Sequence, residues 1–129
     1  MKNNKPTESE LAILQLLWQH GPLSVRAINE MLNEVSDQVI GYTTTLKLMQ
    51  IMHEKGLLVR NTDQRSHIYR FAVKENETQQ NLLNEFLDAT YRGSASKLVM
   101  QALGHHKASK EELQMIKDYI QNLELKNKK

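Results

Sequence analysis

The side chains with the widest range of chemistry in this sequence are five histidines, because cysteine is absent. Imidazole can transfer a proton near neutral pH or bind a transition metal. No two histidines stand four residues apart, as two ligands on one helix face would. His105 and His106 are adjacent in a predicted polar loop, a setting more typical of solvated side chains than of a metal site. We therefore predict no bound metal, with a metal-responsive regulator that uses this pair as an alternative.

The sequence carries no pattern that is typical of an enzyme. It has no nucleophile elbow, no glycine-rich phosphate loop and no HExxH motif. Its carboxylates fall mainly on predicted exposed helix faces and helix caps, so none stands out as a general acid or base. With seven aromatic residues and no additional domain, a small-molecule pocket is also unsupported. We expect neither catalysis nor a cofactor.

Charge is distributed unevenly along the chain. The formal net charge is only +2, but residues 47–74 hold six cations against two anions. A local cationic surface on a nearly neutral protein favours binding to a polyanion such as duplex DNA. The alternative is an ordinary solvated surface, which composition alone does not exclude.

The most informative segment is a predicted helix over residues 42–55, which ends at Gly56. Its apolar side carries Thr45, Leu48, Met49 and Met52, at the spacing i, i+3, i+4 and i+7. The opposite side carries Thr43, Lys47 and Gln50, with Thr44 on its border and Tyr42 at the helix start, and these are the residues that we predict to contact DNA. Hydroxyl, amide and ammonium groups can bind phosphates and base edges. A solvated helix face usually carries several glutamates, whereas this helix has no anion before Glu54.

Two further helices and a hairpin surround that segment. The sequence from Thr7 to Glu10 fits a capping box that starts a helix, and the Gly21–Pro22 pair stops it. Ser24 is the predicted N-cap of a second, short helix. Residues 57–60 and 67–71 read as strands with a polar connection between them. Three helices followed by a basic hairpin predict a winged helix-turn-helix over residues 1–74, in which Arg60 and Arg65 contact phosphates.

Residues 75–129 have a different character. Helices are predicted over residues 75–91 and 96–103, the second ending at Gly104, and a last helix follows a capping box that begins at Ser109. About fifty residues of this kind cannot close a core alone, so we predict a three-helix dimerisation domain. Its predicted interface residues are Leu83, Phe86, Leu87, Leu98, Leu113, Ile116, Ile120 and Leu123. The alternative is that these helices fold back on the N-terminal domain of the same chain.

The expected fold is thus mainly α with a small β-hairpin wing, and the expected partner is double-stranded DNA. The N-terminal residues are polar, and no run of about 18–20 apolar residues is present to cross a bilayer. Together with the absence of cysteine, this predicts a cytoplasmic protein without membrane insertion. A winged-helix adaptor that binds other proteins is a second possible function.

The pattern resembles the penicillinase repressors, which include the BlaI/MecI repressors and copper-responsive relatives. The resemblance lies in residues 10–18 with their terminal Trp18, residues 42–46, residues 54–58 and residues 91–99, and it extends from about Thr7 to Leu123. It implies a homodimeric repressor on a dyad-symmetric operator that overlaps a promoter.

The resemblance also implies how repression ends. In the β-lactam-responsive members a membrane sensor-protease system leads to cleavage at an Asn–Phe pair in the short dimerisation helix. The matching positions here are Gln101 and Ala102, which depart from that pair. The copper-responsive members carry Cys-x-Cys motifs, and this cysteine-free chain excludes thiolate copper sensing.

Overall fold

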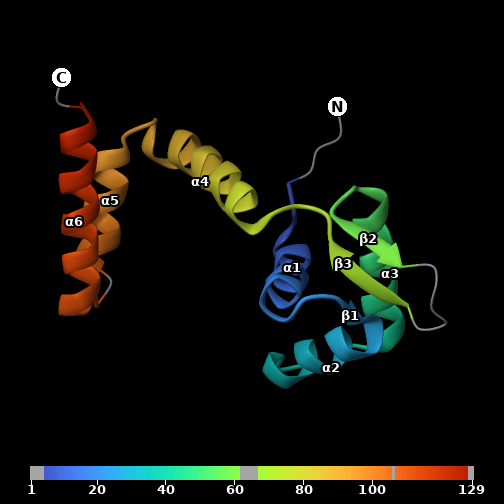
Figure 1. Cartoon of the computed structure of the whole chain (residues 1–129). Helices are drawn as coiled ribbons and strands as arrows, with labels where there is room; N and C mark the ends of the chain where they lie inside the picture. Colours follow the sequence, from blue (N-terminus) through green and yellow to red (C-terminus); the bar gives the residue numbers. More distant parts are fainter. Residues whose placement is uncertain (1–4, 62–66, 106, 128–129) are drawn as a thin grey trace. The chain divides into compact units, whose positions relative to one another are not determined.

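The computed structural model describes residues 5–61, 67–105 and 107–127. The chain divides into two compact units, residues 1–82 and residues 83–129, and each is considered by itself (Figure 1). The fold is mainly α with a small antiparallel sheet, which confirms the predicted winged-helix class. Within the described residues, no helix is both long and apolar enough to cross a membrane.

Helix α1 (Glu8–His20) begins and ends as its sequence predicts. The Thr7 hydroxyl accepts a hydrogen bond from the Glu10 amide at 3.2 Å, and the Glu10 carboxylate accepts one from the Thr7 amide at 2.9 Å. This reciprocal box satisfies two N–H groups that a helix start leaves without partners. The helix stops at Gly21, whose φ of 82° is a conformation that favours glycine.

Helices α2 (Val25–Val35) and α3 (Tyr42–Glu54) form the helix-turn-helix pair. The Ser24 hydroxyl caps α2 by accepting from the Ala27 amide at 3.0 Å, as predicted. The apolar side of α3 faces the core as predicted, because Thr45, Met49 and Met52 are buried and Leu48 packs against the core.

The sheet has one strand more than the predicted hairpin. β2 (Leu58–Asn61) and β3 (Ile68–Phe71) pair antiparallel, and β1 (Leu23–Ser24) pairs with the other edge of β3. Residues 62–66, the connection between β2 and β3, lie outside the described residues. Strand β1 was not predicted, because two residues are too few to show an alternating pattern. The pairing of β1 with β3 connects the wing to the segment that leads directly into α2.

A single apolar core joins the three helices to the sheet. Its buried members are Ile13, Leu14, Leu17, Val25, Ile28, Met49, Met52, Leu57, Leu58 and Tyr69. Trp18 packs at the edge, and its indole N–H donates to the Val73 carbonyl at 3.1 Å. Because the inner side of α3 faces this core, its outer side is left exposed.

The second unit is built from the C-terminal half of α4 (Glu75–Tyr91), α5 (Ala95–His105) and α6 (Lys110–Asn127). Arg92 and Gly93 end α4 with positive φ values of 53° and 82°. Helix α5 continues through Gly104, although the sequence predicted an end there. One glycine costs a helix only about 1 kcal/mol, which neighbouring residues can offset. The predicted domain boundary at residues 74 and 75 falls at the start of α4, and it stays a prediction.

Candidate nucleic-acid interface

The predicted DNA-contact residues of α3 are all exposed, with Thr43, Lys47 and Gln50 on its outer side, Thr44 at the border and Tyr42 at the helix start. Tyr42 is 39% exposed, and Thr43, Thr44, Lys47 and Gln50 are exposed as well. Burial of Thr45, Met49 and Met52 on the inner side fixes this orientation, because rotating the helix would expose the core. The outer side therefore offers hydroxyls, an amide and an ammonium group to a partner, with Glu54 as the first anion along the helix.

Helix α2 adds a cation that sequence reasoning did not select. The guanidinium of Arg26 lies over the ring of Tyr42, 5.6 Å from the ring centroid, in a cation–π arrangement. Arg26 is exposed and brings a positive charge to the start of α3. The sequence held a usable signal, since this is the one cation between Ser24 and Val39.

The sheet brings a second cation close to α3. Arg60 is exposed on β2, opposite the buried Tyr69 of β3. Arg60 and Gln50 line the same open hollow of about 290 Å³, together with His53, Glu54 and Tyr69. The structure thus places two of the predicted contact residues, one from the helix and one from the wing, on one surface. Arg65 belongs to the connection outside the described residues.

Lys55 is partly buried and paired with an acidic side chain. Its ammonium group lies 2.6 Å from the carboxylate of Glu10, whose side chain is only 3% exposed. Burial raises the pKa of Glu10, but the hydrogen bond from Lys55, the bonds from Thr7 and the Lys55 charge lower it more, so the pKa lies below its ordinary value. Because Lys55 is the C-cap of α3, this pair ties the end of that helix to α1.

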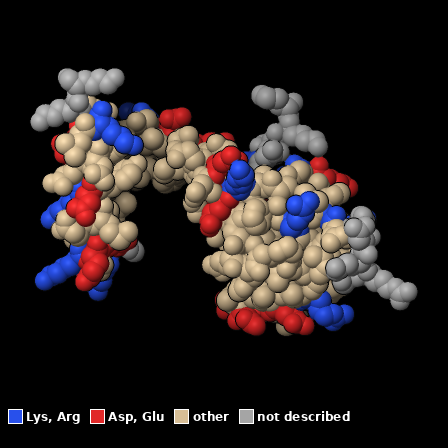
Figure 2. Space-filling model, viewed as in Figure 1, with Lys and Arg blue, Asp and Glu red and all other residues tan. Residues whose placement is uncertain are grey.

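Helix α3 and strand β2 carry one acidic side chain, Glu54. Figure 2 shows red carboxylates gathered over α2, where Glu30 and Glu34 are exposed. The Glu10 carboxylate is paired and buried. The surface formed by α3 and β2 consequently carries the cations Lys47 and Arg60 against the single anion Glu54.

The histidines do not come together in the described part of the chain. His20, His53, His67 and His105 are exposed, while His106 lies outside the described residues. Among the residues that the structure describes, no group of three histidine, aspartate or glutamate side chains could hold a metal ion. Whether His105 and His106 bind a metal stays a prediction from the sequence.

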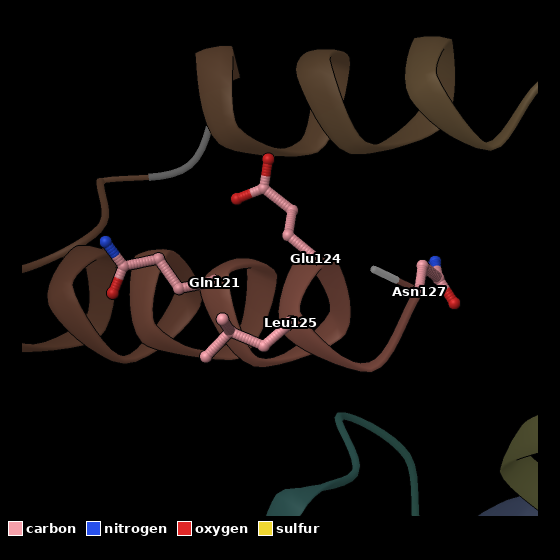
Figure 3. Close-up of a pocket in the computed structure, with 4 residues that line it drawn as sticks. All are labelled: Gln121, Glu124, Leu125 and Asn127. Carbon is pink, nitrogen blue, oxygen red and sulfur yellow. The ribbon is translucent and has the colours of Figure 1, made fainter. Parts of the chain in front are cut away.

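An open hollow of about 730 Å³ in the second unit is lined by Gln121, Glu124, Leu125 and Asn127, all from α6. Figure 3 shows that these side chains do not converge, since Glu124 and Leu125 extend to different sides of the helix. In small-molecule sites, a few polar side chains converge on one enclosed pocket. This hollow lacks that arrangement.

The predicted interface residues of the second unit keep much of their apolar surface exposed. Leu83, Phe86, Leu113, Ile120 and Leu123 are between 39% and 52% exposed, and Leu87, Leu98 and Ile116 are half-buried. No described residue from 83 to 127 is buried. These helices thus form no core of their own within the described residues.

Comparison with known proteins gives two findings. A family model described as penicillinase repressor matches residues 6–122, which is most of the chain. A penicillinase repressor from Bacillus licheniformis is 23% identical over 124 residues, an alignment that covers 95% of this chain and 93% of that protein. Both matches run from α1 into α6, so they include the helix-turn-helix unit and the helices that follow it.

Proposed function

Because this chain belongs to the penicillinase repressor family, we propose that it represses transcription as a homodimer bound to a dyad-symmetric site in double-stranded DNA. Each copy inserts α3 into a major groove and lays the wing on the flanking backbone. A regulator of this kind acts on the chromosome, in the cytoplasm, and its work is binding rather than catalysis.

The observation that carries the proposal is the composition of the outer side of α3. Thr43, Thr44 and Gln50 offer hydrogen-bond donors and acceptors to base edges, and Lys47 offers a charge to phosphate or guanine. Tyr42 stands at the start of the helix, where a phenol can contact the backbone. Anions on this side of α3 would repel phosphates, and none precedes Glu54 in the helix.

The wing supports the proposal through charge. Arg60 lines the same hollow as Gln50, so a helix seated in the major groove would bring this guanidinium to the adjacent phosphates. We assign Arg65, at the tip of the wing sequence, the same task. Such contacts strengthen binding to every sequence and make it sensitive to salt.

The state of the second unit supports the homodimer. A set of helices without a buried side chain is not stable alone, and a second copy of the same exposed surface would bury it symmetrically. Linking two DNA-binding units also raises affinity, because the second half-site is bound from a high local concentration. Loss of the dimer would then release the operator.

Loss of the dimer is also the route by which we propose repression ends. Gln101 and Ala102 stand at the cleavage positions of the β-lactam-responsive relatives, and both are exposed on α5. A sensor-protease system would have to accept this altered pair. Mass spectrometry of the protein after β-lactam exposure of its host should show a fragment that ends in this region, and an intact chain in derepressed cells would reject this route.

Electrophoretic mobility-shift assays with random duplex at low salt test whether the protein binds DNA at all. A DNA-binding protein should retard even random duplex under these conditions, whereas an adaptor that binds proteins should not. Selection of bound fragments from the source genome then gives the operator and its symmetry.

Lys47→Ala should weaken binding to the selected site, with Lys117→Ala as the matched control, because Lys117 is exposed on α6. Equal binding by the two variants would contradict the assignment of Lys47.

A further inference from the structure

Helix α2 carries a polar stripe that meets the start of α3. Arg26, Asn29 and Asn33 are spaced by three and four residues, so they lie along one side of the helix. Val25 and Ile28 are buried on the neighbouring side, which holds α2 against the core. All three members of the stripe contact either α3 or the turn that leads to it.

Asn33 stabilises the turn between α2 and α3 through both the oxygen and the nitrogen of its side-chain amide. Its Oδ1 accepts from the Ile40 amide at 2.6 Å, and its Nδ2 donates to the Ile40 carbonyl at 3.0 Å. The side chain thus pairs with both polar backbone groups of Ile40, as a neighbouring strand would. Ile40 precedes Gly41, the N-cap of α3, so this pairing fixes the point from which the helix starts.

Asn29 continues the contact into α3 itself. Its Nδ2 donates to the carbonyls of Ile40 and Gly41 at 3.0 and 3.3 Å, and to the Thr45 hydroxyl at 2.8 Å. Thr45 is only 1% exposed, so this bond is shielded from competing water. One amide therefore spans from the last turn residue to Thr45, the fourth residue of the helix.

Gly41 caps α3 without a side-chain hydrogen bond, so the position of this helix start depends on groups from elsewhere. The stripe supplies them, and Arg26 extends it to the ring of Tyr42. We propose that Asn29 and Asn33 are positioning residues that set the pose of the start of α3 and thereby support its discrimination between DNA sequences. This inference rests on the function proposed above.

Weakening the polar stripe should affect sequence-specific binding and random-sequence binding differently. Thr43 and Thr44 have short side chains that cannot reach across a gap, so base readout through them needs an accurately placed helix. Binding to random DNA depends on long cationic side chains and phosphates, and it tolerates a displaced helix. Weakening the stripe should therefore reduce sequence discrimination while leaving random-sequence binding nearly unchanged.

The test compares Asn29→Ala and Asn33→Ala with the wild type and with Asn76→Ala, a control at an exposed asparagine of α4. The probes are a duplex that the wild type selects from a random library and a shuffled duplex of the same composition. We expect the ratio of the two affinities to fall by about 5- to 150-fold in the stripe variants, the range for one lost base contact. Affinity for the shuffled duplex and the behaviour of Asn76→Ala should not change.

Thr45→Val supplies a second variant with almost the same shape, which removes the hydroxyl acceptor of Asn29 from the other side of the contact. It should lower the ratio in the same direction. An unchanged ratio in folded variants would overturn the inference, as would an equal loss on both duplexes, which indicates a merely structural role. A wild type that selects no duplex at all would instead reject the proposed function.

Discussion

Replacing Phe86 by aspartate should convert the proposed homodimer into a monomer. Phe86 lies on α4, is 52% exposed, and has one edge-on aromatic contact with Tyr91 at 5.7 Å between ring centroids. The remaining ring surface has no buried environment within its own unit, since no described residue from 83 to 127 is buried. In a homodimer, a second copy would cover this exposed ring surface.

The size of the effect follows from the exposed area. A phenylalanine buries about 200 Å² when fully covered, so an exposed half leaves about 100 Å² for the partner. At about 25 cal/mol per Å², covering it contributes about 2.5 kcal/mol per copy, or about 5 kcal/mol for the symmetric pair. Losing that contribution weakens dimerisation by about 10³- to 10⁴-fold, before the cost of burying two carboxylates is added.

Sedimentation equilibrium measures this loss directly, with Ile120→Asp as an independent variant on α6. Asn122→Asp is the matched control, because it adds the same charge to α6 at an exposed position about half a turn away from Ile120. The two interface variants should sediment as monomers at concentrations where the wild type and the control are dimers. Intact dimers in both interface variants would refute the proposed interface, and a monomeric wild type would refute the homodimer itself.

Further predictions concern the pair at the end of α3 and the cations of the wing. The pKa of Glu10 lies below its ordinary value, so its carboxylate stabilises the fold above the unfolded pKa of about 4.3, and this contribution is lost as the pH falls through the folded pKa. Lys55→Met should lower the free energy of unfolding at neutral pH by about 1–3 kcal/mol. That difference should shrink in acid, and a difference independent of pH in urea titrations would contradict the role of the pair. Arg60→Ala and Arg65→Ala should each reduce the slope of log affinity against log salt by about 1, for operator and random duplex alike. Slopes equal to that of the wild type would remove these two phosphate contacts.

The parts of the fold that sequence predicted are those determined by local interactions. The capping box of Thr7 and Glu10 spans four residues, and the apolar side of α3 repeats within two turns. Strand β1 escaped prediction because its two residues take extended form through pairing with β3, more than forty residues away. The end of α5 was placed too early because Gly104 only disfavours a helix weakly and its neighbours continue it.

The candidate site shows the same division. Periodicity identified the outer side of α3, because the buried positions of a helix also define its exposed ones. The bonds that Asn29 makes with Gly41 and Thr45 depend on how α2 packs against α3, and no spacing within α2 signals them. Lys55 was counted with the cations of a DNA-binding surface, although the fold pairs it with Glu10, 45 residues earlier in the chain.

The central claim is that the outer side of α3 reads duplex DNA, and the most direct measurement is the affinity of Gln50→Ala for the duplex that the wild type selects. Gln15→Ala, at an exposed glutamine of α1, is the matched control. The account predicts that Gln50→Ala binds about 5- to 150-fold more weakly, the range for one lost base contact, while Gln15→Ala binds as the wild type does. Equal affinity of the two variants, together with unchanged binding by Lys47→Ala, would contradict it.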